Sequence, residues 1–174
     1  MTEHKILFTG TMGAGKTTAI AAISDSPPVS TDVRNLDQSN TKATTTVGLD
    51  FAELTLDNGE VLRLYGTPGQ QRFDFMWTIL AKGAMGLVIL IDNSRDKPLD
   101  DLDIFLKGFD GLIRSTACVI GVGRTEQHHT PSVDQYADHL GKYGIHAPVI
   151  AVDVRVREDV LQLLDLLLLQ LDKS

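Results

Sequence analysis

A glycine-rich turn near the start of the chain constrains the fold more than any other feature. Residues Gly10–Thr17 read Gly-Thr-Met-Gly-Ala-Gly-Lys-Thr, between a short apolar run, Lys5–Thr9, and the helix-like residues Lys16–Ser24. The turn matches the pattern G-x-x-x-x-G-K-[ST], in the strand, turn and helix context that this pattern requires. The start of the chain is therefore predicted to form a strand, a tight turn and a helix.

The residue types in this turn suit a chain of phosphates. Glycines let the backbone wrap around an anion with its N–H groups pointing inward, and the N-terminus of a helix adds partial positive charge. Lys16 is placed to reach the terminal phosphates, and the Thr17 hydroxyl is placed to bind Mg²⁺. A chance glycine-rich turn is the alternative, which average composition makes rare. The nucleotide-binding residues predicted here are Gly10, Thr11, Met12, Gly13, Ala14, Gly15, Lys16, Thr17 and Thr18.

Strand-like and helix-like runs alternate along the rest of the chain. The further expected strands are Val47–Leu56, Val61–Tyr65, Ala84–Ile91, Ala117–Val122 and Pro148–Val154, and the further expected helices are Leu99–Ile113, Ser132–Tyr143 and Glu158–Leu171. This alternation predicts an α/β fold with helices on both faces of a mixed, mostly parallel sheet. Together with the glycine-rich motif, it indicates the three-layer fold of P-loop NTPases. The sequence Asp57-Asn58-Gly59-Glu60 signals a hairpin, which adds one antiparallel edge strand. We expect a single domain over residues 1–174.

One segment has no clear periodicity. Asp25–Thr46 is rich in Ser, Thr, Pro and Asn and lies between the first helix and the second expected strand. A structureless loop of this length is uncommon in a compact domain. Two interpretations remain open: a functional lid, or an element that the pattern fails to reveal.

Composition excludes several classes of partner. The chain has 174 residues with 16 basic and 23 acidic side chains, a net charge of -7, which argues against general nucleic-acid binding. The chain has a single cysteine, Cys118, so no disulfide can form within it, which fits a reducing compartment. Cys118 lies in an apolar run and is expected in the core. We find no signal peptide, lipidation motif or bilayer-spanning run. The expectation is a cytoplasmic protein without a membrane span or lipid anchor.

Two more segments complete a recognisable pattern. Thr46-Val47-Gly48-Leu49-Asp50-Phe51 closes the irregular segment, and Gly66-Thr67-Pro68-Gly69-Gln70 follows the strand Val61–Tyr65. Together with Gly10–Thr17, these segments resemble the small GTPases of the Ras superfamily over essentially the whole chain. The proline in the second segment resembles the bacterial MglA-like group.

The resemblance implies roles for three residues in these segments. Thr46 would bind Mg²⁺ and sense the γ-phosphate, the backbone N–H of Gly69 would meet the γ-phosphate, and Gln70 would orient the attacking water. The alternative for Thr46 is a β-branched residue that only begins a strand. The alternative for Gln70 is a solvated loop residue without a role in hydrolysis. Phe73, Phe75, Met76 and Trp77, which follow, are either core residues under the next helix or an apolar patch for a partner.

The chain departs from the resembled pattern at two phosphate-site positions. Gly66 stands where the second segment normally begins with Asp, which holds an Mg²⁺-bound water, so Mg²⁺ support is expected to be weaker or differently supplied. Asp92, at the end of the next strand, is either a substitute or a structural residue. Met12 stands where many relatives have glycine, and its bulk near Gln70 predicts slow hydrolysis.

The base-recognition motif is also altered. Where the family has Asn-Lys-x-Asp, this chain reads Gly123-Arg124-Thr125-Glu126. The stem and guanidinium of Arg124 can lie along the base, while the Glu126 carboxylate suits the two donors of guanine. Glu126 is otherwise a surface acid. The resemblance also implies that a backbone N–H at Val154 contacts the guanine oxygen.

These features predict a GTP-binding switch that uses Mg²⁺, hydrolyses GTP slowly to GDP and changes its binding to a protein partner. The resemblance implies a roadblock-type regulator and a role in motility, polarity or signalling. No residue is marked as an arginine finger; Arg34, Lys42, Arg72 or a partner are the candidates for the positive charge that catalysis needs. A degenerate GTPase acting as a scaffold is the alternative, and a small-molecule kinase is disfavoured because the chain has no arginine-rich lid segment.

Overall fold

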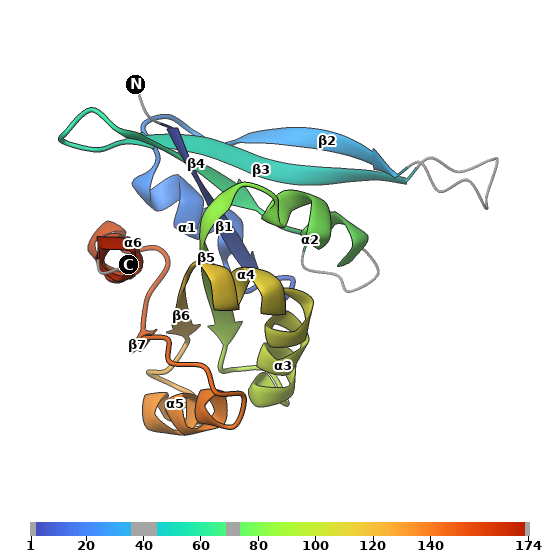
Figure 1. Ribbon diagram of the computed structural model, residues 1–174. Coiled ribbons are helices and arrows are strands. Elements are labelled where there is room, and N and C mark those ends of the chain that lie inside the picture. Colours follow the sequence, from blue (N-terminus) through green and yellow to red (C-terminus); the bar gives the residue numbers. More distant parts are fainter. Residues whose placement is uncertain (1–2, 36–44, 69–73, 173–174) are drawn as a thin grey trace.

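A central sheet organises the computed structural model, which describes residues 3–35, 45–68 and 74–172. Within these residues the sheet has seven strands in the order β2-β3-β4-β1-β5-β6-β7 (Figure 1). The strands are β1 (Glu3–Gly10), β2 (Val29–Asn35), β3 (Thr45–Thr55), β4 (Val61–Gly66), β5 (Ala84–Asp92), β6 (Ala117–Gly123) and β7 (Val149–Ala151). The helices are α1 (Lys16–Ile23), α2 (Asp74–Ala81), α3 (Pro98–Gly108), α4 (Asp110–Ser115), α5 (Val133–Gly141) and α6 (Arg157–Asp172).

The strand directions confirm the predicted α/β class. β1 pairs in parallel with β4 and β5, and β6 pairs in parallel with β5 and β7. Among the strands described, β3 alone runs opposite to the others, so it is antiparallel to both β2 and β4. The hairpin that leads from β3 to β4 closes with Gly59 at φ 88° and with a hydrogen bond from the Leu56 N–H to the Glu60 carbonyl at 2.8 Å. The antiparallel strand β3 was expected at the edge of the sheet. It lies one position inward instead, because β2 pairs with it and forms the edge.

β2 also corrects the interpretation of Asp25–Thr46 as irregular. Its ladder with β3 runs from Val29 opposite Phe51 to Asn35 opposite Thr45. Backbone hydrogen bonds to a long neighbouring strand can hold an edge strand whose own side-chain pattern does not alternate. The second interpretation of that segment, an unrevealed element, is therefore correct for residues 29–35. A lid made by residues 36–44 lies outside the described residues and stays a prediction.

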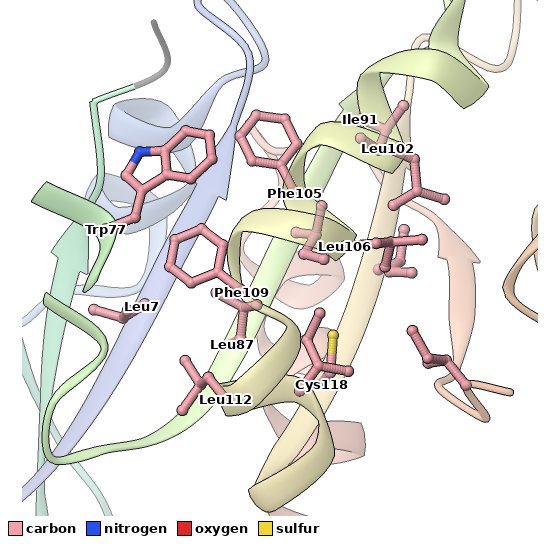
Figure 2. Close-up of a cluster of buried hydrophobic side chains, with 14 of the residues drawn as sticks. Leu7, Trp77, Leu87, Ile91, Leu102, Phe105, Leu106, Phe109, Leu112 and Cys118 are labelled. Atoms are coloured by element: carbon pink, nitrogen blue, oxygen red, sulfur yellow. The ribbon is translucent and has the colours of Figure 1, made fainter. Parts of the chain in front are cut away.

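Helices cover both faces of the sheet and close a hydrophobic core on each. One core packs α1 and α6 against the sheet, and the other packs α2, α3, α4 and α5 against the opposite face. On the second face the indole of Trp77 stacks on Phe109, with ring centroids 5.2 Å apart, and lies 5.2 Å from the ring of Phe105 (Figure 2). The Trp77 indole N–H donates to the Pro68 carbonyl at 3.0 Å. Trp77 and Met76 are each 2% exposed, so the core interpretation of these two residues is confirmed.

Two predicted helices show how local signals and packing compete. The run Leu99–Ile113 forms two helices, α3 and α4, because Phe109 leaves helical geometry (φ -115°, ψ 22°) where its ring is buried against Trp77. Ser132, with which the predicted helix Ser132–Tyr143 begins, is the N-cap of α5: its hydroxyl accepts from the Gln135 N–H at 3.2 Å. The Ser132 N–H donates to Oε1 of Gln135 at 2.7 Å, which completes a capping box.

The end of the sheet differs slightly from prediction. β7 covers Val149–Ala151 instead of Pro148–Val154. Pro148 has no N–H for the ladder, although its carbonyl accepts from the Ile120 N–H at 3.0 Å. The remaining residues of the predicted strand turn toward α6 and approach the glycine-rich loop.

Cys118 lies in the core as predicted. The residue is 3% exposed on β6, and burial raises the pKa of its thiol to about 12. A thiol in this state reacts slowly at neutral pH, because the thiolate is the nucleophile. In the parts of the chain that the structure covers, no helix combines the length and apolar character needed to cross a membrane.

The packing around Trp77 can be tested with a matched pair of glycines. A Cβ added at Gly108 would lie 2.5 Å from Cε3 and 2.6 Å from Cζ3 of the buried Trp77 ring, whereas a Cβ at Gly111 of α4 would meet no atom within 4 Å. We expect Gly108→Ala to lower the free energy of unfolding by about 1–3 kcal/mol through overpacking. Gly111→Ala should raise it by up to about 1 kcal/mol through helix propensity. Chemical denaturation measures both, and equal effects of the two substitutions would contradict this packing.

Candidate functional site

The glycine-rich loop joins β1 to α1 and depends on glycine at three positions. Gly10, Gly13 and Gly15 have φ angles of 154°, 81° and 96°, where side chains cause strain. A Cβ at Gly10 would collide with the Leu90 carbonyl of β5, and a Cβ at Gly15 would lie 2.7 Å from Cγ2 of Val154. The loop backbone is therefore pressed against β5 on one side and the segment before α6 on the other. This close packing fixes the loop at the N-terminus of α1.

Lys16 lies folded back along the loop that it ends. Its Nζ donates to the carbonyls of Gly10 at 2.6 Å and Thr11 at 3.0 Å. Burial lowers the pKa of Lys16 to about 8, against an opposing effect of the Asp50 carboxylate. A buried ammonium group is stabilised by an anion, and phosphate is the anion that such a loop accepts. The buried Thr11 Oγ1 has no hydrogen-bond partner within the described part of the chain, so a polar group of the loop is also left for a ligand.

Thr17, the next residue, meets a carboxylate from β3. The Thr17 hydroxyl donates a short hydrogen bond to Oδ2 of Asp50. Asp50 lies on the same face of β3 as Ala52 and Leu54, which are buried in the core beneath α1. The alternation of this strand therefore carries one acidic residue onto a face that is otherwise apolar, directly below the start of α1.

Asp50 also occupies the neighbourhood of Gly66. The two residues are opposite each other in the β3–β4 ladder. A Cβ added at Gly66 would lie 3.3 Å from Cβ and 3.5 Å from Oδ2 of Asp50, and 3.3 Å from Cδ1 of Ile20. The Asp50 carboxylate thus fills the side of the site where a side chain at position 66 would extend. Sequence reasoning missed Asp50 as a site residue, although an acidic residue at an inward-facing strand position was a usable signal.

Asp92 takes the structural role instead of substituting at the phosphate site. Its carboxylate forms a short ion pair with the Arg124 guanidinium and accepts from the N–H and hydroxyl of Ser94, at 2.9 Å and 2.6 Å. Burial alone would raise the pKa of Asp92, but the bonds from Ser94 and Arg124 outweigh it and hold the pKa below its usual value. Asp92 therefore anchors the loop after β6.

Arg124 connects that loop to the glycine-rich loop. It has a positive φ of 59°, and its Nη1 donates to the Gly13 carbonyl at 3.3 Å. The buried Asn93 supports the same loop: its Nδ2 donates to the carbonyls of His128 at 2.8 Å and Pro131 at 2.9 Å. Its Oδ1 accepts from the Tyr136 hydroxyl at 2.5 Å. Arg124 thus links the loop after β6 to the glycine-rich loop, and Asn93 holds the far end of the same loop. Sequence reasoning did not anticipate the contribution of Asn93.

The remaining predicted residues divide into three groups. Val154 packs against Gly15, and Glu126 is exposed and close enough to Arg155 to help raise the pKa of that guanidinium, after the larger effect of Asp153. Thr46 belongs to β3, opposite Arg34 of β2. Gly69 and Gln70 lie outside the described residues, as do Lys42, Arg72 and Phe73. The structure therefore brings together the glycine-rich loop, Arg124 and Val154, and adds Asp50.

Comparison with known proteins finds partial sequence matches and a shared fold. A family model described as "Conserved hypothetical ATP binding protein" matches residues 31–106. The Ras-related protein Rab-10 of Caenorhabditis elegans is 31% identical over 109 residues, which are 61% of this chain and 49% of that protein. Human Ras-related protein Rab-8B is 29% identical over 109 residues, 61% of this chain and 47% of the relative. The match thus spans about half the length of these relatives.

Solved structures share the whole architecture. The G domain of the T. maritima FeoB iron transporter superposes with a TM-score of 0.71 at 15% identity, over 97% of this chain and 99% of that chain. A bacterial selenocysteine-specific elongation factor, EF-Sec, gives a TM-score of 0.69 at 14% identity, over 100% of this chain and 29% of the other. The fold is that of a G domain. The likeness to Rab proteins extends over 109 residues, and the fold is that of a P-loop NTPase.

The state of Lys16 predicts how nucleotide binding depends on pH. Its pKa of about 8 in the free protein lies below the ordinary 10.5, and bound phosphate raises the pKa again, so binding takes up a proton above pH 8. Affinity for labelled GDP, titrated in EDTA, should therefore be full below pH 8 and about tenfold weaker at pH 9 than at pH 7. Lys16→Met should bind weakly with little pH dependence. An affinity of the native protein that stays constant from pH 7 to 9 would contradict this description of Lys16.

Proposed function

We propose that this protein is a guanine-nucleotide switch, built as a single P-loop domain over residues 1–174. The observation that carries the proposal is the convergence of Lys16, Thr17 and Asp50 at the start of α1, inside a loop that requires glycine. A buried ammonium group, a metal-binding hydroxyl and a carboxylate form the set of groups that a nucleotide with a divalent cation needs. The output of such a switch is a change in partner binding.

The residues of the loop would hold and orient the phosphates. The backbone N–H groups of residues 13–18 would surround them, and Lys16 would exchange the carbonyls of Gly10 and Thr11 for phosphate oxygens. Thr17 and Thr46 would be the protein ligands of Mg²⁺, which would supply charge neutralisation between the β- and γ-phosphates. Gly69 would donate its N–H to the γ-phosphate, and Gln70 would orient the attacking water.

Hydrolysis is proposed to be slow. Met12 is 60% exposed in the glycine-rich loop. Its bulk would crowd the space that Gln70 and an incoming arginine need. We assign the positive charge that hydrolysis needs near the transferring phosphate to a protein partner. The resemblance supports a cytoplasmic MglA-like GTPase that is controlled by a roadblock-type regulator.

Guanine recognition would rest on three residues around the base pocket. Glu126 would accept hydrogen bonds from the N1–H and the exocyclic amine of guanine, and the stem of Arg124 would lie along the ring. Arg124 is already fixed by Asp92 and the Gly13 carbonyl, so this side chain is held in place before the base binds. The backbone N–H of Val154 would meet the guanine oxygen.

Two alternatives are supported by particular observations. The family model described as ATP-binding favours adenine as a competing base. The glycines at 66 and 123 favour a scaffold that retains the loop only for its fold. Titration of nucleotide-free protein with labelled GTP and labelled ATP, with and without Mg²⁺, separates them. Binding of GTP alone supports the switch, equal binding of both indicates a P-loop protein without base selection, and binding of neither leaves the scaffold.

Base selection itself predicts the effect of one substitution. Glu126→Gln replaces two acceptors by one acceptor and one donor, which suits the C2 carbonyl of xanthine in place of the guanine amine. We expect the affinity for GTP to fall roughly tenfold to hundredfold, since hydrogen bonds to charged groups are lost, and the affinity for XTP to rise.

Competition of unlabelled GTP and XTP against a labelled nucleotide measures this exchange. Glu53→Gln removes an exposed carboxylate from β3 and should leave both affinities unchanged. If Glu126→Gln kept the same preference for GTP, Glu126 would be a solvated surface residue that does not contact the base.

A further inference from the structure

We propose that Asp50 supplies the carboxylate that the phosphate site lacks at Gly66, so that Mg²⁺ is supported from β3 instead of β4. The inference rests on the proposed nucleotide site and deepens it. Its starting observation is the hydrogen bond from the Thr17 hydroxyl to Oδ2 of Asp50, which joins the predicted metal ligand directly to a carboxylate from another element.

The strand register explains how one residue can stand in for the other. Asp50 and Gly66 are paired across the β3–β4 ladder, so their side-chain positions lie on the same face of the sheet. That face is the one beneath α1, because Ala52 and Leu54, two and four residues beyond Asp50, belong to the core there. A carboxylate on either strand at this level points toward the N-terminus of α1.

The space at Gly66 makes the two positions interdependent. A Cβ at position 66 would be 3.3 Å from Cβ of Asp50 and 3.3 Å from Cδ1 of Ile20, which is tighter than ordinary contact. A full aspartate side chain there would place two carboxylates side by side, and like charges at that distance repel. Gly66 therefore leaves room for the Asp50 side chain.

The hydrogen bond has the direction that a metal site requires. Thr17 donates its proton to Asp50, which leaves the lone pairs of the hydroxyl oxygen free for a cation. Asp50 retains lone pairs that can accept from a metal-bound water, the role of a carboxylate beyond the direct ligands. A purely structural link between α1 and β3 would show the same bond, so the distinction is the response to Mg²⁺.

The test measures release of labelled GDP from the protein as a function of Mg²⁺ concentration, with EDTA as the metal-free reference. Asp50→Asn keeps the shape and an acceptor for Thr17 but removes the charge. We expect the Mg²⁺ concentration that half-maximally slows release to rise about 10- to 100-fold, the usual effect of losing such a carboxylate. Release in EDTA should change by less than about twofold, since the nucleotide contacts remain.

An exchange of the two residues gives a gain-of-function arm. Asp50→Gly should lose Mg²⁺ sensitivity, and the double variant Asp50→Gly/Gly66→Asp should recover it, because the carboxylate returns to the same face from β4. Glu53→Gln is the matched control: it removes an exposed carboxylate three residues along β3 and should leave the Mg²⁺ response unchanged. Thermal unfolding of each variant checks that it is folded.

The outcomes separate this inference from the proposed function. If Asp50→Asn binds GDP with an unchanged Mg²⁺ response, Asp50 is only a structural link and the inference is wrong while the nucleotide site stands. Loss of the Mg²⁺ response in Asp50→Gly, followed by its recovery in Asp50→Gly/Gly66→Asp, supports the inference. If the native protein fails to bind GDP at all, the proposed function is wrong and this inference falls with it.

Discussion

The close approach of the β1–α1 turn to β5 is the constraint on which the rest of the site depends. At Gly10 the backbone comes so near the Leu90 carbonyl that no Cβ fits, and at Gly15 it meets the side chain of Val154. This packing fixes where α1 begins and so where its N–H groups point. Because Lys16 and Thr17 are the first residues of α1, the positions of the Lys16 ammonium group and of the Thr17 hydroxyl follow from the same contact.

The charges around this turn come from β3, from the end of β5 and from the loop after β6. Asp92 at the end of β5 holds Arg124, which follows β6 and reaches back to the Gly13 carbonyl. Asp50 on β3 holds Thr17. Each carboxylate thus orients one neighbouring group, and neither is free to replace the other. A parallel sheet brings Asp92 and Arg124 together because the carboxyl ends of its strands meet at one edge. Asp50 reaches this edge from within the antiparallel β3, opposite Gly66 at the end of β4.

The sequence predicts most of the fold because its signals are local. The glycine spacing, the continuous apolar run of β5 and the Ser132 cap each act within a few residues. β2 was missed because pairing with β3 holds it, and the break at Phe109 was missed because the burial of its ring decides it. Asp50 was missed for a similar reason: its bond to Thr17 spans 33 residues and becomes visible only when β3 and α1 are placed together.

The central claim is that Thr17 and Asp50 form one side of a nucleotide-bound metal site. Anomalous diffraction from crystals grown with GDP and Mn²⁺ tests it most directly, because Mn²⁺ accepts the same oxygen ligands as Mg²⁺ and is located by its own signal. The account predicts a Mn²⁺ peak within coordination distance of Thr17 Oγ1, with a water between the metal and the Asp50 carboxylate. A metal bound away from Thr17, or an Asp50 carboxylate that contacts neither Thr17 nor a metal-bound water, would contradict it.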